Sequence, residues 1–158
     1  MNKILSKTVI LFLLFGITGC SYKPIFLEKN YNFEIQEIFL DGDKDINRNI
    51  KNKLEFIKSN ESNDKKSYKV NIKSIKSREI VSKDSKGDPV KFELNILVEY
   101  KIIFNNNILL DNKIEKKSIY NNESDQFKLE QTEDIILKNL TRSISDIIIS
   151  SIINLDDN

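Results

Sequence analysis

Residues 90–104 contain the sequence pattern that most limits how this chain can fold. Apolar side chains occupy every second position along it, namely Val90, Phe92, Leu94, Ile96, Val98, Tyr100, Ile102 and Phe104. The positions between them include Lys91, Glu93, Asn95, Glu99 and Lys101. Because successive side chains of a strand point to opposite faces, this pattern predicts a long strand with one buried face and one polar face.

The segments on either side supply partners for this strand. Three asparagines at 105–107 tolerate positive φ, so the strand is expected to turn back as a hairpin onto residues 108–120. Before it, residues 68–81 are predicted as another strand, which begins with clean alternation of apolar and polar residues. A bulge is predicted near Ser74 and Ile75, where the apolar residues change from even to odd positions. A turn containing Gly87 and the strand-starting Pro89 separates the two.

A further strand is predicted at 31–40, where Phe33, Ile35 and Phe39 are spaced by multiples of two. The aspartate-rich run that follows differs from a calcium loop, because Ile46 and Asn52 stand where glycine and glutamate are required. We instead expect Asp43 or Asp45 to cap a helix over 45–59, and 60–67 to be a polar loop.

Two stretches show helical spacing. The first stripe consists of Ile46, Ile50, Leu54 and Ile57, and the second, after a polar turn at 121–125, consists of Ile136, Leu140, Ile144, Ile148, Ser151, Ile152 and Leu155. The polar residues Lys138, Asn139, Arg142 and Asp146 argue against a membrane span in the second. The predicted fold is therefore an α+β two-layer domain, in the order β-α-β-β-β-α, with two helices on one face of a four-stranded, mostly antiparallel sheet.

The first twenty residues have the order of a secretory leader. Lys3 and Lys7 precede an apolar run at 8–17, which has about half the roughly 20 residues that a transmembrane helix needs. The closing Ile17-Thr18-Gly19-Cys20 resembles a lipobox, so cleavage is expected between Gly19 and Cys20, with lipid added to the Cys20 sulfur. This predicts a signal peptide at 1–19, a lipidated linker at 20–30 and a single domain at 31–158.

The composition excludes several classes of function. Lys and Arg total 25 against 24 Asp and Glu, so no basic excess indicates nucleic-acid binding. The chain has no histidine, Cys20 is its only cysteine, and only Gly42 and Gly87 lie beyond the leader. We therefore expect no enzyme, no metal site and no cofactor other than the covalent lipid on Cys20.

The chain resembles the LPS-assembly lipoprotein LptE family over nearly its whole length. Residues 20–26, Cys-Ser-Tyr-Lys-Pro-Ile-Phe, are similar to the family's Cys-Gly-Phe-Arg-Pro-Leu-Tyr opening, with Ser21 in place of glycine. Residues 48–54 resemble its first-helix Arg-Asn-x-Leu stretch. Tyr68-Lys69-Val70, and Tyr120-Asn121 before the last helix, take the expected places.

The resemblance implies a lipoprotein anchored in the outer membrane, on its periplasmic side. Such a protein would help to assemble the LptD-like β-barrel translocon, plug its lumen and contact lipopolysaccharide. By resemblance to well-studied lipoprotein sorting, Ser21 rather than Asp after Cys20 favours the outer membrane. The polar face of the predicted sheet is compatible with a polar barrel lumen. An auxiliary or ligand-binding envelope lipoprotein, for example of an ABC-type lipid-trafficking system, is the alternative.

Six basic residues concentrate around the second predicted strand and its turn: Lys73, Lys76, Arg78, Lys83, Lys86 and Lys91. They could bind the phosphates of lipid A through charge-assisted hydrogen bonds. The other interpretation is that they form a solvated strand edge, where lysine protects against aggregation.

Overall fold

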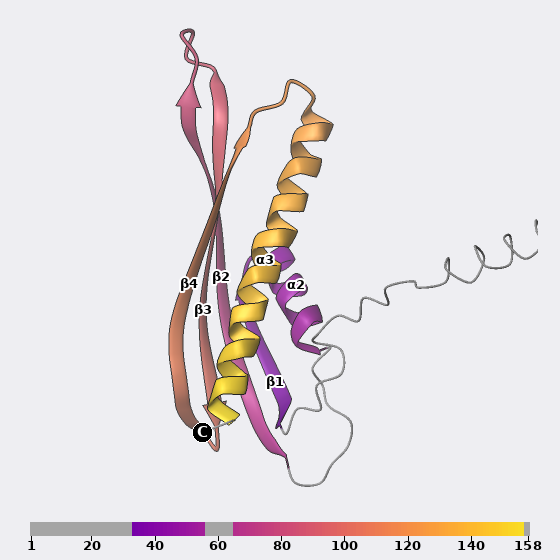
Figure 1. Ribbon diagram of the computed structural model, residues 1–158, viewed down its shortest axis with the longest axis vertical. Helices are drawn as coiled ribbons and strands as arrows, with labels where there is room; N and C mark the ends of the chain where they lie inside the picture. Colours follow the sequence, from indigo (N-terminus) through magenta and orange to yellow (C-terminus); the bar gives the residue numbers. More distant parts are fainter. Residues whose placement is uncertain (1–32, 56–64, 157–158) are drawn as a thin grey trace, which may run out of the picture.

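The computed structural model describes residues 33–55 and 65–156 and confirms the predicted element order (Figure 1). The elements are β1 (Phe33–Gly42), α2 (Lys44–Glu55), β2 (Lys66–Lys83), β3 (Pro89–Phe104), β4 (Asn107–Asn121) and α3 (Gln126–Asp156). The predicted signal peptide, Cys20, the linker at 20–30 and Ile57 lie outside the described residues.

The four strands form one sheet in the order β1-β2-β3-β4, which confirms the predicted mostly antiparallel arrangement. β1 and β2 are parallel, and α2 belongs to the crossover between them, whereas β2, β3 and β4 pair antiparallel. Both helices cover the same face of the sheet, and α2 packs against α3 (Figure 1). The hydrophobic core therefore lies in a single layer between the sheet and the helices.

β3 is the central contributor to that core. Its inward side chains from Phe92 to Ile102 are buried as the alternation predicts, while Val90 at the strand's start is 39% exposed. The predicted turn to β4 is confirmed by the positive φ of Asn105 (49°) and Asn106 (64°). Asparagine tolerates this left-handed conformation better than most residues, which explains why these residues suit a tight hairpin.

β1 differs from the predicted pattern at its apolar positions. A register shift between Ile35 and Glu37 changes which residues face the helices. Phe33 and Ile35 are buried as expected, but Phe39 is 55% exposed and faces the other side. The prediction that all three share a buried face was therefore wrong, because a bulge inverts the parity of every residue after it.

β2 is more regular than the sequence suggested. Its pairing with β3 runs without a shift from Lys69 to Ile80, so the bulge predicted near Ser74 and Ile75 is absent. Ser74 keeps the inward parity and is buried, while Ile75 points outward and is 48% exposed. The shifts in β2 come later, around Ser82, and the strand begins at Lys66, inside the segment predicted as a loop.

The inward Ser74 is accommodated because it joins a polar junction between β1, α2 and β2. Its hydroxyl lies 2.8 Å from Asn47 Oδ1, and the Asn47 amide donates to the Asp41 carbonyl at 3.0 Å. The Asp43 amide donates to the Ser74 carbonyl at 3.2 Å. A buried polar group costs little stability when it is hydrogen-bonded, and here the bonds attach the start of α2 to the sheet.

Asp43 caps α2, which confirms the first of the two predicted caps, Asp43 or Asp45. Its Oδ1 atom accepts from the amides of Asp45 and Ile46, both at 3.0 Å, and its other oxygen lies 3.3 Å from Lys76 Nζ. Burial alone would raise the pKa of Asp43, but the amide hydrogens and Lys76 outweigh it and lower the pKa below its ordinary value of 3.8.

α3 runs along the sheet as far as the start of the β2–β3 hairpin tip and supplies the second apolar surface (Figure 1). Its buried apolar residues are Leu129, Leu137, Ile144, Ile148, Ile149 and Ile152, with Ile136 and Leu140 packed at the margin. Thr141 and Ser145 are also buried, and their hydroxyls donate to the carbonyls of the preceding turn. None of the helices in the described residues is both long enough and apolar enough to cross a bilayer.

Gly42 and Gly87 form a matched pair for testing the junction, because both have positive φ (96° and 92°). A Cβ at Gly42 would lie 1.9 Å from the Ser74 carbonyl oxygen, whereas a Cβ at Gly87 would meet open space. We expect Gly87→Ala to lower the unfolding free energy by about 1 kcal/mol and Gly42→Ala by about 3 kcal/mol or more. Urea unfolding measures both values, and equal losses would contradict this account of the junction.

Substitutions at Asp43 separate its charge from its capping role. Asp43→Ala should lower the unfolding free energy by about 1 to 2 kcal/mol, and Asp43→Asn should lose less, because asparagine also caps helices well. The folded-state pKa lies below 3.8, so the charge stabilises the fold above about pH 4, and this contribution is lost as pH falls through the folded pKa. Unfolding curves should therefore differ between wild type and Asp43→Asn at neutral pH and converge under acid conditions.

Candidate functional site

The sheet face turned away from the helices, called here the polar face, is covered with charges of alternating sign. Four of its ion pairs join neighbouring strands: Lys69 with Glu37 at 3.0 Å, Lys101 with Asp111 at 2.9 Å, Lys117 with Glu93 at 3.6 Å and Lys113 with Glu99 at 4.0 Å. Lys117 also lies 3.2 Å from Glu115. Most charges on this face therefore have a partner of opposite sign on the same face.

Apolar side chains are interspersed on the same surface. Phe39, Ile75, Ile108 and Ile119 are each between 48% and 58% exposed. Their positions in the strand registers place them on the polar face rather than against the helices. The polar face is thus charged but nearly balanced, with isolated apolar patches between its ion pairs.

The six basic residues predicted as one cluster are divided by the pleat of the sheet. Lys76 and Arg78 keep the inward parity of β2, because no bulge intervenes at Ser74, and they lie on the helix side. Each meets a carboxylate there: Lys76 contacts Asp43 at 3.3 Å, and Arg78 Nε lies 3.2 Å from Glu133. The prediction of a single basic surface was therefore wrong, and these two cations are already neutralised.

The other four predicted cations remain without an ion pair among the described residues. Lys73 and Lys91 lie on the polar face, and Lys83 and Lys86 lie at the turn between β2 and β3. The Asp84 carboxylate shapes this turn by accepting from the backbone amides of Lys86 and Asp88, both at 2.9 Å. Lys83, Lys86 and Lys91 are therefore brought together at one end of the molecule.

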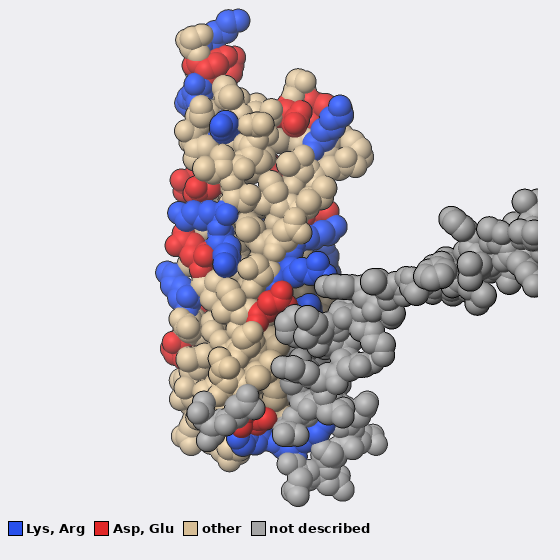
Figure 2. Space-filling view, viewed as in Figure 1, with Lys and Arg blue, Asp and Glu red and all other residues tan. Residues whose placement is uncertain are grey.

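We call residues 80–91 the hairpin tip. It extends beyond the first turn of α3 (Figure 1). Basic and acidic side chains both lie at this end of the molecule (Figure 2). Three apolar side chains of the tip are largely exposed: Ile80 at 48%, Val81 at 45% and Val90 at 39%. Exposed lysines beside exposed aliphatic groups form a surface suited to an amphipathic ligand that carries negative charge.

Arg78 takes part in a cluster that sequence reasoning did not identify. Its guanidinium carbon lies 3.8 Å from the centroid of the Phe92 ring, and Phe92 packs against Tyr120 at 5.8 Å between centroids. The Tyr120 hydroxyl donates to the Glu133 carboxylate at 2.6 Å. The cluster thus joins the first half of α3 to three strands. A cation over an aromatic face and a shared carboxylate both favour keeping Arg78 charged in place.

Burial raises the pKa of Tyr120, and the hydrogen bond to Glu133 raises it further, although Arg78 opposes the shift. Tyr120 therefore remains protonated and acts as a donor. The sequence did contain a signal for Glu133, the partner of Tyr120 and Arg78. Glu133 lies midway between the apolar Leu129 and Leu137 on one helical stripe. A carboxylate in such a stripe is expected to need a buried partner.

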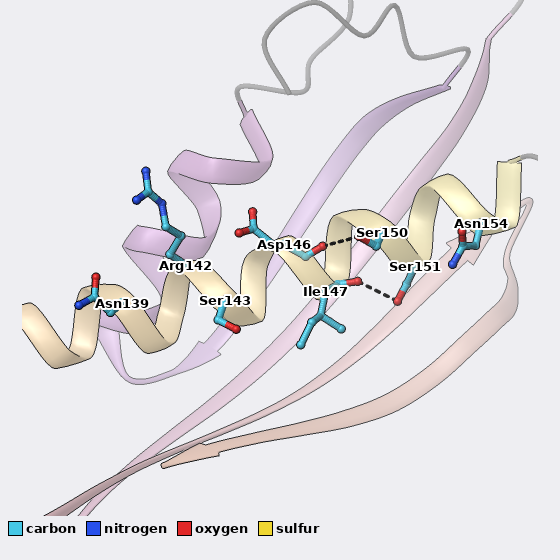
Figure 3. Close-up of a pocket in the computed structure, with 8 residues that line it drawn as sticks. All are labelled: Asn139, Arg142, Ser143, Asp146, Ile147, Ser150, Ser151 and Asn154. Carbon is cyan, nitrogen blue, oxygen red and sulfur yellow. Dashed lines mark hydrogen bonds between the residues drawn. The ribbon is translucent and has the colours of Figure 1, made fainter. Parts of the chain in front are cut away.

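A shallow, open pocket lies along α3 (Figure 3). The described residues that line it all belong to this helix: Asn139, Arg142, Ser143, Asp146, Ile147, Ser150, Ser151 and Asn154. Ser150 and Ser151 donate to the carbonyls of Asp146 and Ile147, and the Asp146 carboxylate lies 3.5 Å from Lys53. The Ser151 hydroxyl also lies 2.8 Å from the Tyr100 hydroxyl, so the hydrogen bonds of both serines are made within the fold.

Within residues 33–55 and 65–156, no group of three His, Cys, Asp or Glu side chains is placed to hold a metal ion. The expectation that the chain has no enzymatic activity and no cofactor stays a prediction. The surfaces that the described residues offer for binding are the polar face and the hairpin tip.

Solved structures share this architecture. Rare lipoprotein B from Shewanella oneidensis is 17% identical and has a TM-score of 0.54, with 75% of this chain and 98% of that chain covered. An uncharacterized lipoprotein B from Nitrosomonas europaea is 16% identical, with a TM-score of 0.58 and coverage of 84% and 92%. A minor lipoprotein from Acinetobacter baumannii is 14% identical, with a TM-score of 0.52 and coverage of 75% and 94%.

These neighbours have LptE-type folds, and the described domain has the same type of fold. The likeness extends over nearly all of each neighbour, so it concerns a whole domain rather than a shared hairpin. No family model matches the sequence, and no curated protein sequence matches it. The relationship is thus visible in the structure, at identities where it establishes the fold alone.

The hydroxyls of Tyr120 and Tyr100 provide a matched test of the Arg78 cluster. Tyr120 donates to a carboxylate, whereas the Tyr100 hydroxyl lies 2.8 Å from the neutral Ser151 hydroxyl. Because hydrogen bonds to charged groups contribute more, Tyr120→Phe should lower the unfolding free energy by about 2 kcal/mol and Tyr100→Phe by about 1 kcal/mol. Thermal and urea unfolding give both numbers, and a smaller loss for Tyr120→Phe would disprove the central role assigned to Glu133.

Proposed function

We propose that this chain is a lipid-anchored lipoprotein of the outer membrane that helps to assemble the β-barrel lipopolysaccharide translocon. In this role the domain occupies the barrel lumen on the periplasmic side and assists the delivery of lipopolysaccharide to the outer leaflet. The observation that carries the proposal is the whole-domain likeness to lipoprotein structures. It coincides with a leader that ends in a lipobox-like Ile17-Thr18-Gly19-Cys20.

The anchor has a physical role in the proposal. A single acyl chain binds a membrane only marginally, whereas the several chains expected on a lipoprotein cysteine hold a protein stably. Anchoring at Cys20 also raises the effective concentration of the domain beside an outer-membrane barrel. A domain with modest intrinsic affinity for the barrel would therefore remain bound to it.

The polar face supports the placement in a lumen. A barrel interior is polar and hydrated, so it suits a surface with many charges and few large apolar areas. The ion pairs of this face neutralise each other locally, as Lys101 does with Asp111. Most charges of the face therefore keep a partner of opposite sign when the face moves from bulk water into a narrower hydrated space.

The hairpin tip supports the contact with lipopolysaccharide. Its lysines Lys83, Lys86 and Lys91, together with Lys73 on the polar face, have no carboxylate partner among the described residues. Lys76 and Arg78 are engaged by Asp43 and Glu133. We therefore restrict the proposed phosphate contacts to the four cations without ion pairs, and the exposed aliphatic groups of the tip suit the acyl chains.

The central experiment is isolation of the native protein in mild detergent, with its partners and the mass of its first peptide determined together. We expect a lipidated peptide beginning at Cys20 and co-purification of a large outer-membrane β-barrel. Cys20→Ser should abolish lipidation and reduce barrel recovery. A mature protein with a free Cys20 thiol would refute the anchor, and a lipidated protein that associates instead with an inner-membrane lipid transporter would support the auxiliary-lipoprotein alternative.

A second experiment addresses the ligand with purified protein and lipopolysaccharide. Replacing Lys83, Lys86 and Lys91 together by alanine should weaken binding by about tenfold, because exposed charge contacts contribute roughly 0.2 to 1 kcal/mol each. The matched control replaces Lys44, Lys128 and Lys138, which are exposed on the helices, and should bind as wild type does. Equal weakening in both triple variants would indicate nonspecific attraction rather than a site at the tip.

A further inference from the structure

The free edge of β4 is a surface that the proposed function does not use. β4 is the last strand of the sheet order, and no described residue pairs with its outer edge. The strand runs over 15 residues, from Asn107 to Asn121. Long unpaired strand edges attract other strands, because each presents a row of backbone donors and acceptors without partners.

The charges that β4 places on the polar face are arranged symmetrically about one residue, Ile114, and the remaining charge of the strand, Lys116, has the parity of the helix side. On the polar face the strand carries Asp111, Lys113, Glu115 and Lys117, in alternating sign. Positions at equal distance on either side of Ile114 carry opposite charges: Lys113 matches Glu115, and Asp111 matches Lys117.

We propose that two copies of this chain pair through their β4 edges, antiparallel and about a two-fold axis at Ile114. The two sheets then form one continuous sheet. Antiparallel pairing about a two-fold axis places each residue opposite its counterpart across the centre. Lys113 therefore faces Glu115 of the second copy, and Asp111 faces Lys117 of the second copy, each twice by symmetry.

The cross-strand rows of the sheet continue across this interface with alternating charge. Within one copy, Lys113 lies beside Glu99 of β3, and Asp111 lies beside Lys101. Pairing places Glu115 of the second copy on the other side of Lys113. It likewise places Lys117 of the second copy on the other side of Asp111. Opposite charges on facing residues of neighbouring strands stabilise a sheet, and like charges destabilise it.

The charge pattern also selects this register over its neighbours. A shift of two residues in one direction places Lys113 opposite Lys113 and Asp111 opposite Glu115. The opposite shift places Glu115 opposite Glu115 and Lys113 opposite Lys117. A shift of one residue would oppose the polar face of one copy to the helix side of the other. Only the register centred on Ile114 pairs all four charges with opposite charges.

Protection of the edge by lysine alone is a weaker explanation. Charges that keep an edge strand unpaired act by repelling a second copy, and a row of one sign would serve that purpose. On the polar face of β4 two acids and two bases cancel, and the chain as a whole has a formal net charge of only +1. The pairing involves neither Cys20 nor the hairpin tip, and it concerns copies of the chain that are not enclosed in a barrel lumen.

The experiment uses the full chain in mild detergent, with micelles in large excess over protein, and measures association by sedimentation velocity. The wild-type protein should dimerise. Lys113→Glu and Glu115→Lys each create two like-charge contacts across the axis and should weaken dimerisation at least about tenfold. Mixing the two single variants should restore it, because the two introduced side chains then face each other with opposite charges. The unchanged Glu115 of one copy likewise faces the unchanged Lys113 of the other.

The mixing step makes the result specific to this interface. Each variant retains its own altered contacts within the fold, so only pairing between copies can explain recovery in the mixture. Lys128→Glu gives the same change in net charge as Lys113→Glu, but Lys128 belongs to α3 rather than to the β4 edge, so this variant should dimerise as wild type does. A monomeric wild-type chain, unchanged association of Lys113→Glu, or a mixture no stronger than its components would each overturn the proposal.

Discussion

The burial of one face of β3 against the two helices is the interaction on which the rest of the structure depends. The inward side chains from Phe92 to Ile102 are buried in the core that the helices cover. Burial of each large apolar side chain contributes roughly 1.5 to 3 kcal/mol, so this strand supplies a large share of the driving force for folding. The opposite face remains free for other uses because the helices cover one side only.

This one-sided arrangement explains why the candidate binding surfaces lie where they do. Polar side chains of β2, β3 and β4 are forced outward together, and they neutralise one another as ion pairs across the strands. Where the β2–β3 hairpin extends past the helices, the inward face also loses its cover, and Ile80 and Val90 become exposed. The lysines at the hairpin tip and these apolar groups are therefore consequences of the same geometry.

The regular alternation of β2 decides which of its basic side chains face the helices and find carboxylate partners there. A continuous strand turns Ser74, Lys76 and Arg78 toward the helices, and each finds polar partners there: the Asn47 amide, Asp43 and Glu133. The β1–α2 junction is thereby joined to the same strand that holds the Arg78 cluster. The fold thus pairs the charged residues on its helix side with partners inside the domain and leaves those at the hairpin tip without an ion pair among the described residues.

The sequence alone determined the order of the elements, the buried face of β3, the asparagine hairpin and the spacing of both helices. These features depend on local periodicity and on the φ preferences of single residues, which are properties of the chain itself. Only the tertiary structure decided the bulge in β1, the regular path of β2 and the partners of Arg78. Such features depend on what lies across the sheet or on a distant helix. Ser74 in an apolar pattern resembles a slip of register until Asn47 and Asp41 are seen beside it, because long-range hydrogen bonds offset its burial.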